Sequence, residues 1–143
     1  MCGITGFWTT SRLGDEAERQ LDDMILTLAH RGPDGTGRHV HRARGLALGH
    51  TRLSINDLGE TGAQPLYSPD HRFALVANGE LYDFKRIRST LMAQGDRFGS
   101  KSDNELAIRL YERHGLDFVH HLRGEFAIAL YDEREDTLLL VRD

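Results

Sequence analysis

Apolar and polar residues recur with two different periods along this chain, and each period predicts an element. Residues 2–9 alternate small, β-branched and aromatic side chains, which predicts a strand. From about 15 to 30 the apolar residues recur at helical spacing, with acidic residues in the first turn and Gly32-Pro33 at the end. This segment is therefore predicted to be an amphipathic helix, and the Gly-rich run 31–37 a loop.

The rest of the chain continues the mixture of strands and amphipathic helices. The predicted strands are 38–41, 45–54, 73–77, 125–131 and 137–142, the last two forming a hairpin. The predicted helices are about 83–94, 102–115 and a short piece at 117–122. A long connection is expected from 56 to 70, and Ser102 with Glu105 matches a capping box at a helix start. The periodicity thus predicts an α+β fold, with sheets covered by helices.

Length and composition favour a single globular domain, residues 1–143. Hydrophobic residues make up 39% and charged residues 28% of the chain. The net charge is −4 and no basic run is present, so no nucleic acid partner is expected. The longest apolar runs are far too short to span a membrane, so no membrane partner is expected either. With one cysteine and no export signal visible, a cytoplasmic location is expected.

The most informative residue is Cys2, the only cysteine of the chain. If Met1 is removed, Cys2 carries both a thiol and the α-amino group. An α-amine has a reference pKa of roughly 7.7–8.0, so it is partly neutral near pH 7 and can act as a base toward the thiol. The alternative is ordinary packing, because a lone cysteine is more often a small buried hydrophobe.

Other polar residues lie at the ends of the predicted strands and helices, and each could have a structural role instead of a functional one. Asn78-Gly79 is also the commonest signal for a hairpin turn. Asp103 could serve only the dipole of its helix, Arg31 could be a charge at a helix end, and Arg52 an ordinary surface residue. No set of His, Cys and carboxylates has zinc or di-iron spacing, and no phosphate-binding glycine loop is visible, so neither a metal nor a nucleotide site is expected.

Six motifs in order nevertheless resemble one family. They are Cys2-Gly3-Ile4-Thr5-Gly6-Phe7, His30-Arg31-Gly32-Pro33-Asp34, Gly49-His50-Thr51-Arg52-Leu53-Ser54-Ile55, Gln64-Pro65-Leu66, Asn78-Gly79-Glu80-Leu81-Tyr82 and Ser102-Asp103-Asn104-Glu105. The chain resembles the N-terminal glutaminase domain of glutamine-hydrolysing asparagine synthetases, which are class II glutamine amidotransferases of the N-terminal nucleophile hydrolase fold. The resemblance implies a four-layer αββα sandwich of two antiparallel sheets flanked by helices, here truncated at its C-terminus.

The resemblance also implies a role for each matching residue. Cys2 would attack the side-chain amide of glutamine and form a γ-glutamyl thioester, with release of ammonia. The Asn78 side chain and the Gly79 N–H would stabilise the oxyanion. The implied substrate-binding residues are Arg52 for the α-carboxylate, Glu80 and Asp103 for the α-ammonium, and backbone groups near Ile55. Arg31 and Asp34 would hold the loop around the nucleophile.

The implied partners lie mostly outside this chain. The glutaminase domain needs no cofactor, whereas a C-terminal synthetase domain, absent here, would use ATP and Mg to make asparagine from aspartate. A homodimer is possible in such a family. Two alternatives stay open: a non-catalytic or unprocessed glutaminase-like module that keeps Met1, and an amidotransferase domain that serves another ammonia acceptor.

Overall fold

The computed structural model describes residues 2–54 and 62–143. Its strands are β1 (Gly3–Trp8), β2 (Gly35–His41), β3 (Leu46–Arg52), β4 (Leu66–Tyr67), β5 (Phe73–Leu81), β6 (Gly124–Asp132) and β7 (Thr137–Arg142). Its helices are α1 (Glu16–Thr27), α2 (Phe84–Ala93) and α3 (Glu105–His114), with short 3₁₀ segments η1 (Arg42–Arg44) and η3 (Gly115–His121). No helix in the described ranges is long and apolar enough to cross a membrane.

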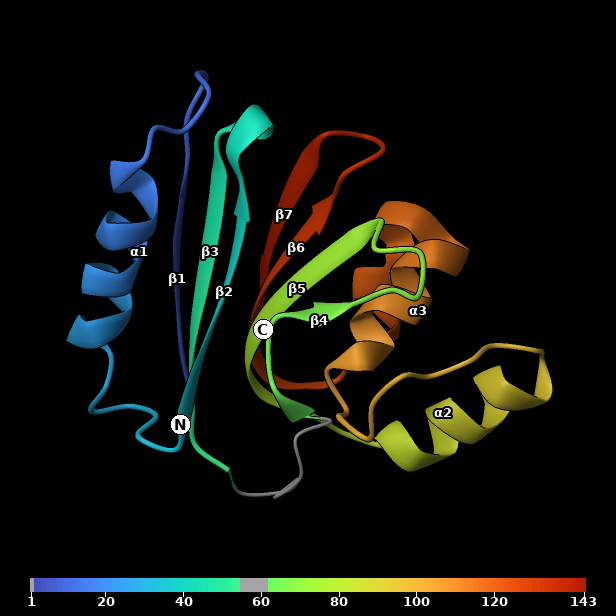
Figure 1. Cartoon of the computed structure of the whole chain (residues 1–143). Helices are drawn as coiled ribbons and strands as arrows, with labels where there is room; N and C mark the ends of the chain where they lie inside the picture. The colour runs from blue at the N-terminus through green and yellow to red at the C-terminus, as the bar shows by residue number, and fades with distance from the viewer. Residues whose placement is uncertain (1, 55–61) are drawn as a thin grey trace.

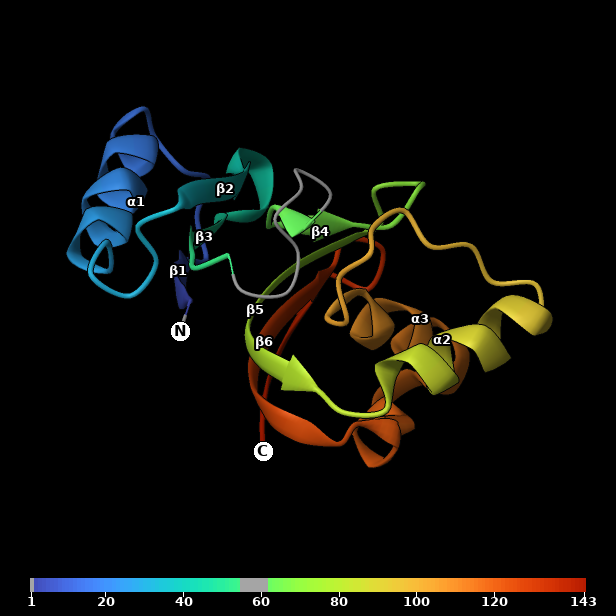
Figure 2. The same ribbon diagram turned by 90° about the horizontal axis from the view of Figure 1, so that it is seen from below.

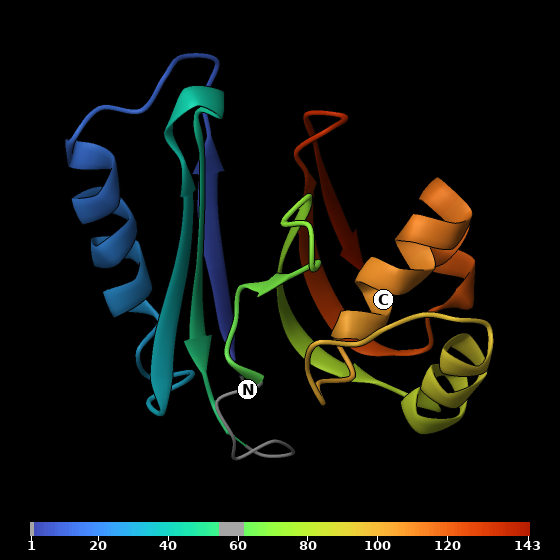
Figure 3. The same ribbon diagram turned by 45° about the vertical axis from the view of Figure 1, so that its right-hand side comes forward.

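The strands form two antiparallel sheets that pack face to face. One sheet has the order β1-β3-β2 and the other the order β4-β5-β6-β7. Helix α1 covers the outer face of the first sheet, and α2 and α3 cover the outer face of the second (Figures 1 and 3). The end-on view shows the same succession of helix, sheet, sheet and helices (Figure 2). The predicted α+β fold with four αββα layers is therefore confirmed.

Three apolar clusters fill the spaces between the four layers. Strand β3 contributes to two of them, because successive side chains point to opposite faces. Leu46 and Leu48 pack with Val76 between the sheets, whereas Ala47 packs against α1. A third and larger cluster lies between the second sheet and helices α2 and α3. Because both faces of each sheet are covered, alternation of polar and apolar residues is weak in the central strands.

The Asn78-Gly79 pair lies inside a strand and not in a hairpin turn. The predicted strand 73–77 is too short, since β5 continues to Leu81 and pairs with β6 along its whole length. Gly79 lies opposite Phe126 in that pairing. The turn preference of Asn-Gly is local, and it is overridden here by pairing with a strand far along the chain.

Two further local predictions are corrected. Strand β2 begins at Gly35, inside the predicted loop, and β4 falls within the predicted connection 56–70. The capping box is wrong, because Asn104 occupies the N-cap position of α3 and makes no side-chain cap bond. The Glu105 carboxylate instead accepts hydrogen bonds from Gly99 and Ser100.

Candidate active site

The inward-facing positions of the first sheet become polar toward one end of the sandwich. Ile4 and Leu48 belong to the cluster between the sheets. Side chains two positions apart on a strand point to the same face. Cys2 therefore lies on the inner face with Ile4, and His50 and Arg52 lie on it with Leu48. Ile4 and His50 are also direct partners in the β1–β3 pairing. Cys2 and Arg52 therefore reach the space between the sheets from two adjacent strands.

The second sheet supplies polar groups from the facing side. Val76 belongs to the same inner cluster, so Asn78 and Glu80 project inward further along β5. Asp103 comes from the segment before α3, and its Oδ2 accepts a hydrogen bond of 2.6 Å from the Leu81 N–H. This contact ties Asp103 to the strand that carries Glu80.

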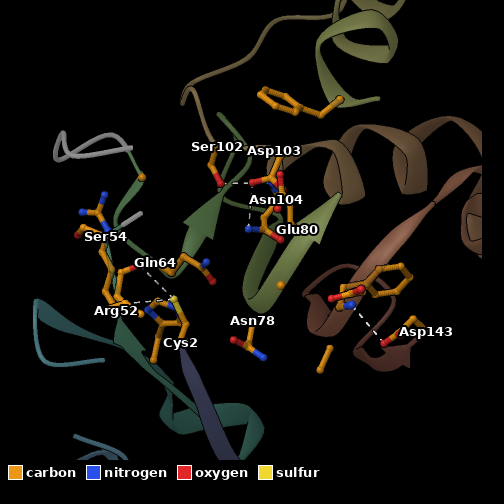
Figure 4. Close-up of a pocket in the computed structure, with 18 of the residues that line it drawn as sticks. Cys2, Arg52, Ser54, Gln64, Asn78, Glu80, Ser102, Asp103, Asn104 and Asp143 are labelled. Atoms are coloured by element: carbon orange, nitrogen blue, oxygen red, sulfur yellow. Dashed lines mark hydrogen bonds between the residues drawn. The ribbon is translucent and has the colours of Figure 1, made fainter. Parts of the chain in front are cut away.

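These groups surround one cleft of about 580 Å³. Figure 4 shows Cys2 and Arg52 at one side of the cleft, with Glu80 and Asp103 facing them across it. The predicted site residues that line the cleft are Cys2, Arg52, Asn78, Gly79, Glu80 and Asp103. Ile55 lies outside the described residues. The structure thus brings together six residues that are as much as 101 positions apart in sequence.

Arg31 and Asp34 do not line the cleft, but each contacts the backbone at or near Cys2. The Arg31 Nε donates a hydrogen bond of 3.0 Å to the Cys2 carbonyl. Asp34 accepts one of 2.7 Å from the Ser54 N–H. The Cys2 Sγ in turn accepts a hydrogen bond of 3.4 Å from the Leu53 N–H. Arg31 and Asp34 therefore hold in place the backbone next to the Cys2 thiol.

Only glycine fits at position 79. Its φ of +140° lies in a region that side-chain-bearing residues rarely adopt, and an added Cβ would overlap the Glu125 carbonyl and the Phe126 Cα. The neighbouring Asn78 has a buried Oδ1 with no hydrogen-bond partner among the described residues. An unsatisfied buried amide oxygen is costly, so this side chain is suited to a ligand in the cleft.

Three charged side chains of the cleft, Arg52, Glu80 and Asp103, match the two charges of a zwitterion. Arg52 can hold a carboxylate with its planar fork, and Glu80 and Asp103 can receive an ammonium group. Burial raises the pKa of Asp103, as does the nearby Glu80, while the hydrogen bond from Leu81 opposes the rise. A cation in the cleft would favour the ionised form of Asp103.

His50 is a cleft residue that sequence reasoning quoted but gave no role. It is 1% exposed, and its Nε2 has no partner among the described residues. Burial lowers the pKa of His50 to about 4, the charge of Arg52 adds to the effect, and a hydrogen bond with the Ala77 backbone opposes it. His50 is therefore neutral near pH 7, and it does not add to the positive charge of Arg52.

Gln64 was likewise quoted without a role. Its Oε1 accepts a hydrogen bond of 2.6 Å from the Ala77 N–H, immediately before Asn78. The backbone carbonyl of Gln64 packs against Gly37, so closely that a Cβ added at Gly37 would overlap it. Gln64 thus links the first sheet to the strand that carries Asn78. Within residues 2–54 and 62–143, no group of three or more His, Cys, Asp or Glu side chains is arranged to hold a metal ion.

Comparison with characterised proteins gives similarity over the whole chain. This chain is 41% identical to the amidase chry2 of Gibberella zeae and covers 22% of that protein. It is 37% identical to asparagine synthetase B (glutamine-hydrolysing) of Escherichia coli and covers 25% of it. The whole of this chain is aligned in both cases, so it spans about a quarter of the length of these relatives.

A solved structure supports the fold. The chain resembles glutamine phosphoribosylpyrophosphate amidotransferase from B. subtilis with a TM-score of 0.78, over 98% of this chain and 37% of that one, at 22% identity. The family profile of the glutamine amidotransferase domain matches residues 1–143. Since this match spans the whole chain, the protein belongs to the glutamine amidotransferase domain family.

Proposed function

We propose that this domain hydrolyses the side-chain amide of glutamine to glutamate and ammonia, with Cys2 as nucleophile. The observation that carries the proposal is the cleft that brings the Cys2 thiol together with Arg52, Glu80 and Asp103. A free α-amino acid with a side-chain amide fits this pattern, because its charged end can bind across the cleft while its amide approaches the thiol. Membership of the glutamine amidotransferase domain family supports the same reaction.

The proposed reaction begins after Met1 is removed. The α-amine of Cys2 takes the thiol proton, and the sulfur attacks the amide carbon of glutamine. The Asn78 side chain and the Gly79 N–H donate hydrogen bonds to the oxyanion of the tetrahedral intermediate. Loss of one such donor typically costs roughly 2.7–4 kcal/mol of transition-state stabilisation.

The intermediate then collapses toward a thioester. The carbon–nitrogen bond breaks, and the α-ammonium of Cys2 returns its proton to the leaving nitrogen, so that neutral ammonia departs. Water adds to the thioester carbonyl, again with the α-amine as base, and the carbon–sulfur bond breaks to release glutamate and the thiol. Arg31, Asp34 and Leu53 maintain the position of Cys2 throughout, through the backbone contacts described above.

We further propose that the ammonia serves an acceptor in the whole protein. Relatives named glutamine-hydrolysing asparagine synthetases favour an ATP- and Mg-dependent step that converts aspartate to asparagine. The two relatives named amidase favour a second candidate, in which a different amide or acceptor is used. The positive and negative groups of the cleft favour an amide that carries both an α-carboxylate and an α-ammonium.

The test is a Cys2→Ala substitution in the full protein, with ammonia release from glutamine as the assay. Glutamine hydrolysis should be lost, while the far-ultraviolet circular dichroism spectrum stays unchanged, because Cys2 precedes β1 and is not part of the apolar clusters. Glutaramic acid (the monoamide of glutaric acid), which lacks only the α-amino group of glutamine, should be a much poorer substrate for the parent protein. Equal activity on both amides, or an active Cys2→Ala variant, would contradict the proposal.

A further inference from the structure

Glu105 is a buried carboxylate whose position the proposed reaction does not explain. It is the first residue of α3 and only 1% exposed. Its Oε1 accepts a hydrogen bond from the Gly99 N–H at 2.8 Å, and its Oε2 accepts two from Ser100, at 2.7 Å from N and 2.6 Å from Oγ. Arg109 donates a fourth, at 3.1 Å to Oε1. A carboxylate with this many donors is held in one orientation.

The charge of Glu105 is maintained despite its burial. Burial by itself raises the pKa of Glu105, but the hydrogen bonds from Ser100, Gly99 and Arg109 outweigh it and lower the pKa. The Arg109 side chain is 5% exposed and also donates to Glu112, at 2.7 Å. Removal of one partner of such a buried ion pair is destabilising, because it leaves the other charge buried and unpaired.

These contacts close a short ring of backbone. Gly99 and Ser100 lie at one end and Glu105 at the other, and the residues between them, 101–104, line the cleft. Inside the ring the Ser100 Oγ accepts a hydrogen bond from the Ser102 N–H at 3.2 Å. The ring therefore determines where Asp103 emerges from the backbone.

Asp103 links this ring to the end of β5. Its Oδ2 accepts the hydrogen bond from Leu81, next to Glu80. Its Oδ1 accepts a longer one of 3.4 Å from Asn104. The carboxylate that faces the cleft is thus held on one side by β5 and on the other by the ring that Glu105 closes.

We propose that Glu105 is a positioning residue for recognition of the substrate's α-ammonium group, acting through Asp103. This inference rests on the proposed function, because it takes Asp103 as an ammonium-binding carboxylate. Glutamine in place of Glu105 preserves size but retains a single acceptor oxygen. Its NH₂ group then faces an N–H donor, so the ring opens and Asp103 moves.

The matched pair of variants is Glu105→Gln and Glu112→Gln. Both remove a carboxylate that binds Arg109, but Glu112 is 30% exposed and makes no contact with residues 99–104 that the structure shows. With glutamine, Glu105→Gln should raise KM by about tenfold or more, as expected for loss of a charge-assisted hydrogen bond, and should change kcat little. Glu112→Gln should keep the KM of the parent protein.

Glutaramic acid separates an effect on recognition of the ammonium group from a general loss of stability. It has no ammonium group, so Glu105→Gln should leave its kcat/KM unchanged relative to the parent protein. Equal losses on both amides would overturn the inference, and so would an unchanged KM for glutamine in a folded Glu105→Gln variant. If Glu105→Gln does not fold, Ser100→Ala removes only the two hydrogen bonds of the Ser100 hydroxyl, the one to Glu105 and the one from Ser102, and leaves the Glu105 carboxylate in place. It should give a smaller change of KM in the same direction; no change would overturn the inference.

Asp103→Asn distinguishes this inference from the proposed function. If Asp103→Asn raises the KM for glutamine alone and Glu105→Gln does not, then Glu105 has no positioning role and the proposed function stands. If Asp103→Asn affects both amides equally, Asp103 does not bind the ammonium group and both statements about it are wrong.

Discussion

Mild acid should destabilise this domain at a pH where most carboxylates are still ionised, because of His50. The pKa of an unfolded histidine is about 6.5, and burial lowers that of His50 to about 4. The unfolded chain therefore takes up a proton that the folded chain excludes. The stability contribution is fully present above pH 6.5 and is lost as the pH falls from about 6.5 to about 4.

The magnitude follows from the two pKa values. One pKa unit corresponds to about 1.4 kcal/mol, so the complete loss is about 3 kcal/mol. Domains are stable by roughly 5–15 kcal/mol, so this loss is a substantial fraction of the total. His39 adds an effect of the same sign, because burial and the nearby His41 lower its pKa as well, although Glu133 opposes them.

The assay is urea unfolding at a series of pH values from about 7.5 to about 4.5, a range that covers the titration of histidine. The parent protein is compared with His50→Gln and with His120→Gln, a substitution at an exposed position. Below pH 6.5 the unfolding free energy of His50→Gln should fall less steeply, by up to about 1.4 kcal/mol per pH unit. His120→Gln should follow the parent curve.

Only the slope against pH carries this test, since His50→Gln also changes packing in the cleft wall. Identical slopes for the parent protein and His50→Gln would refute the reasoning. They would mean that His50 is protonated in the folded state, or that the unfolded chain does not gain the expected proton.

Two further predictions concern the site. Because burial raises the pKa of Asp103, the KM for glutamine should begin to rise, as the pH is lowered, at a higher pH than an ordinary aspartate would give. Asp103→Asn should remove that pH dependence. Steady-state kinetics between roughly pH 8 and pH 5, the range that spans such a shifted carboxyl group, measures both effects. Gly79→Ala should destabilise the domain by about 2–5 kcal/mol, from backbone strain and from overlap with Glu125. Urea unfolding checks the second prediction, and a Gly79→Ala protein as stable as the parent would contradict it.

Local periodicity predicted most elements but not how they are arranged. The helices over 83–94 and 102–115 were found within a few residues, because their apolar faces repeat at helical spacing. The arrangement in four layers followed from the family resemblance. Local signals failed where a distant partner decides the structure, as in the pairing of Gly79 with Phe126.

The contributions of His50, Gln64 and Glu105 could not be predicted from local sequence. Each is a polar residue whose role depends on burial and on contacts that only the folded chain creates. Glu105 matched a capping box, yet its carboxylate reaches Gly99 and Ser100 instead of the helix terminus. A buried polar residue has no periodic signal of its own, so its partner is known only once the layers are packed.

The apolar clusters also determine the orientation of the site. Leu48 and Val76 point into the space between the sheets, and the same two-residue alternation directs His50 and Asn78 into the cleft. A slip of one residue in either strand would expose its apolar side chains to the wrong layer and turn the site residues away together. Packing between the sheets therefore opposes such a slip, and the free energy that stabilises the core also maintains the alignment of Cys2 with the facing strand.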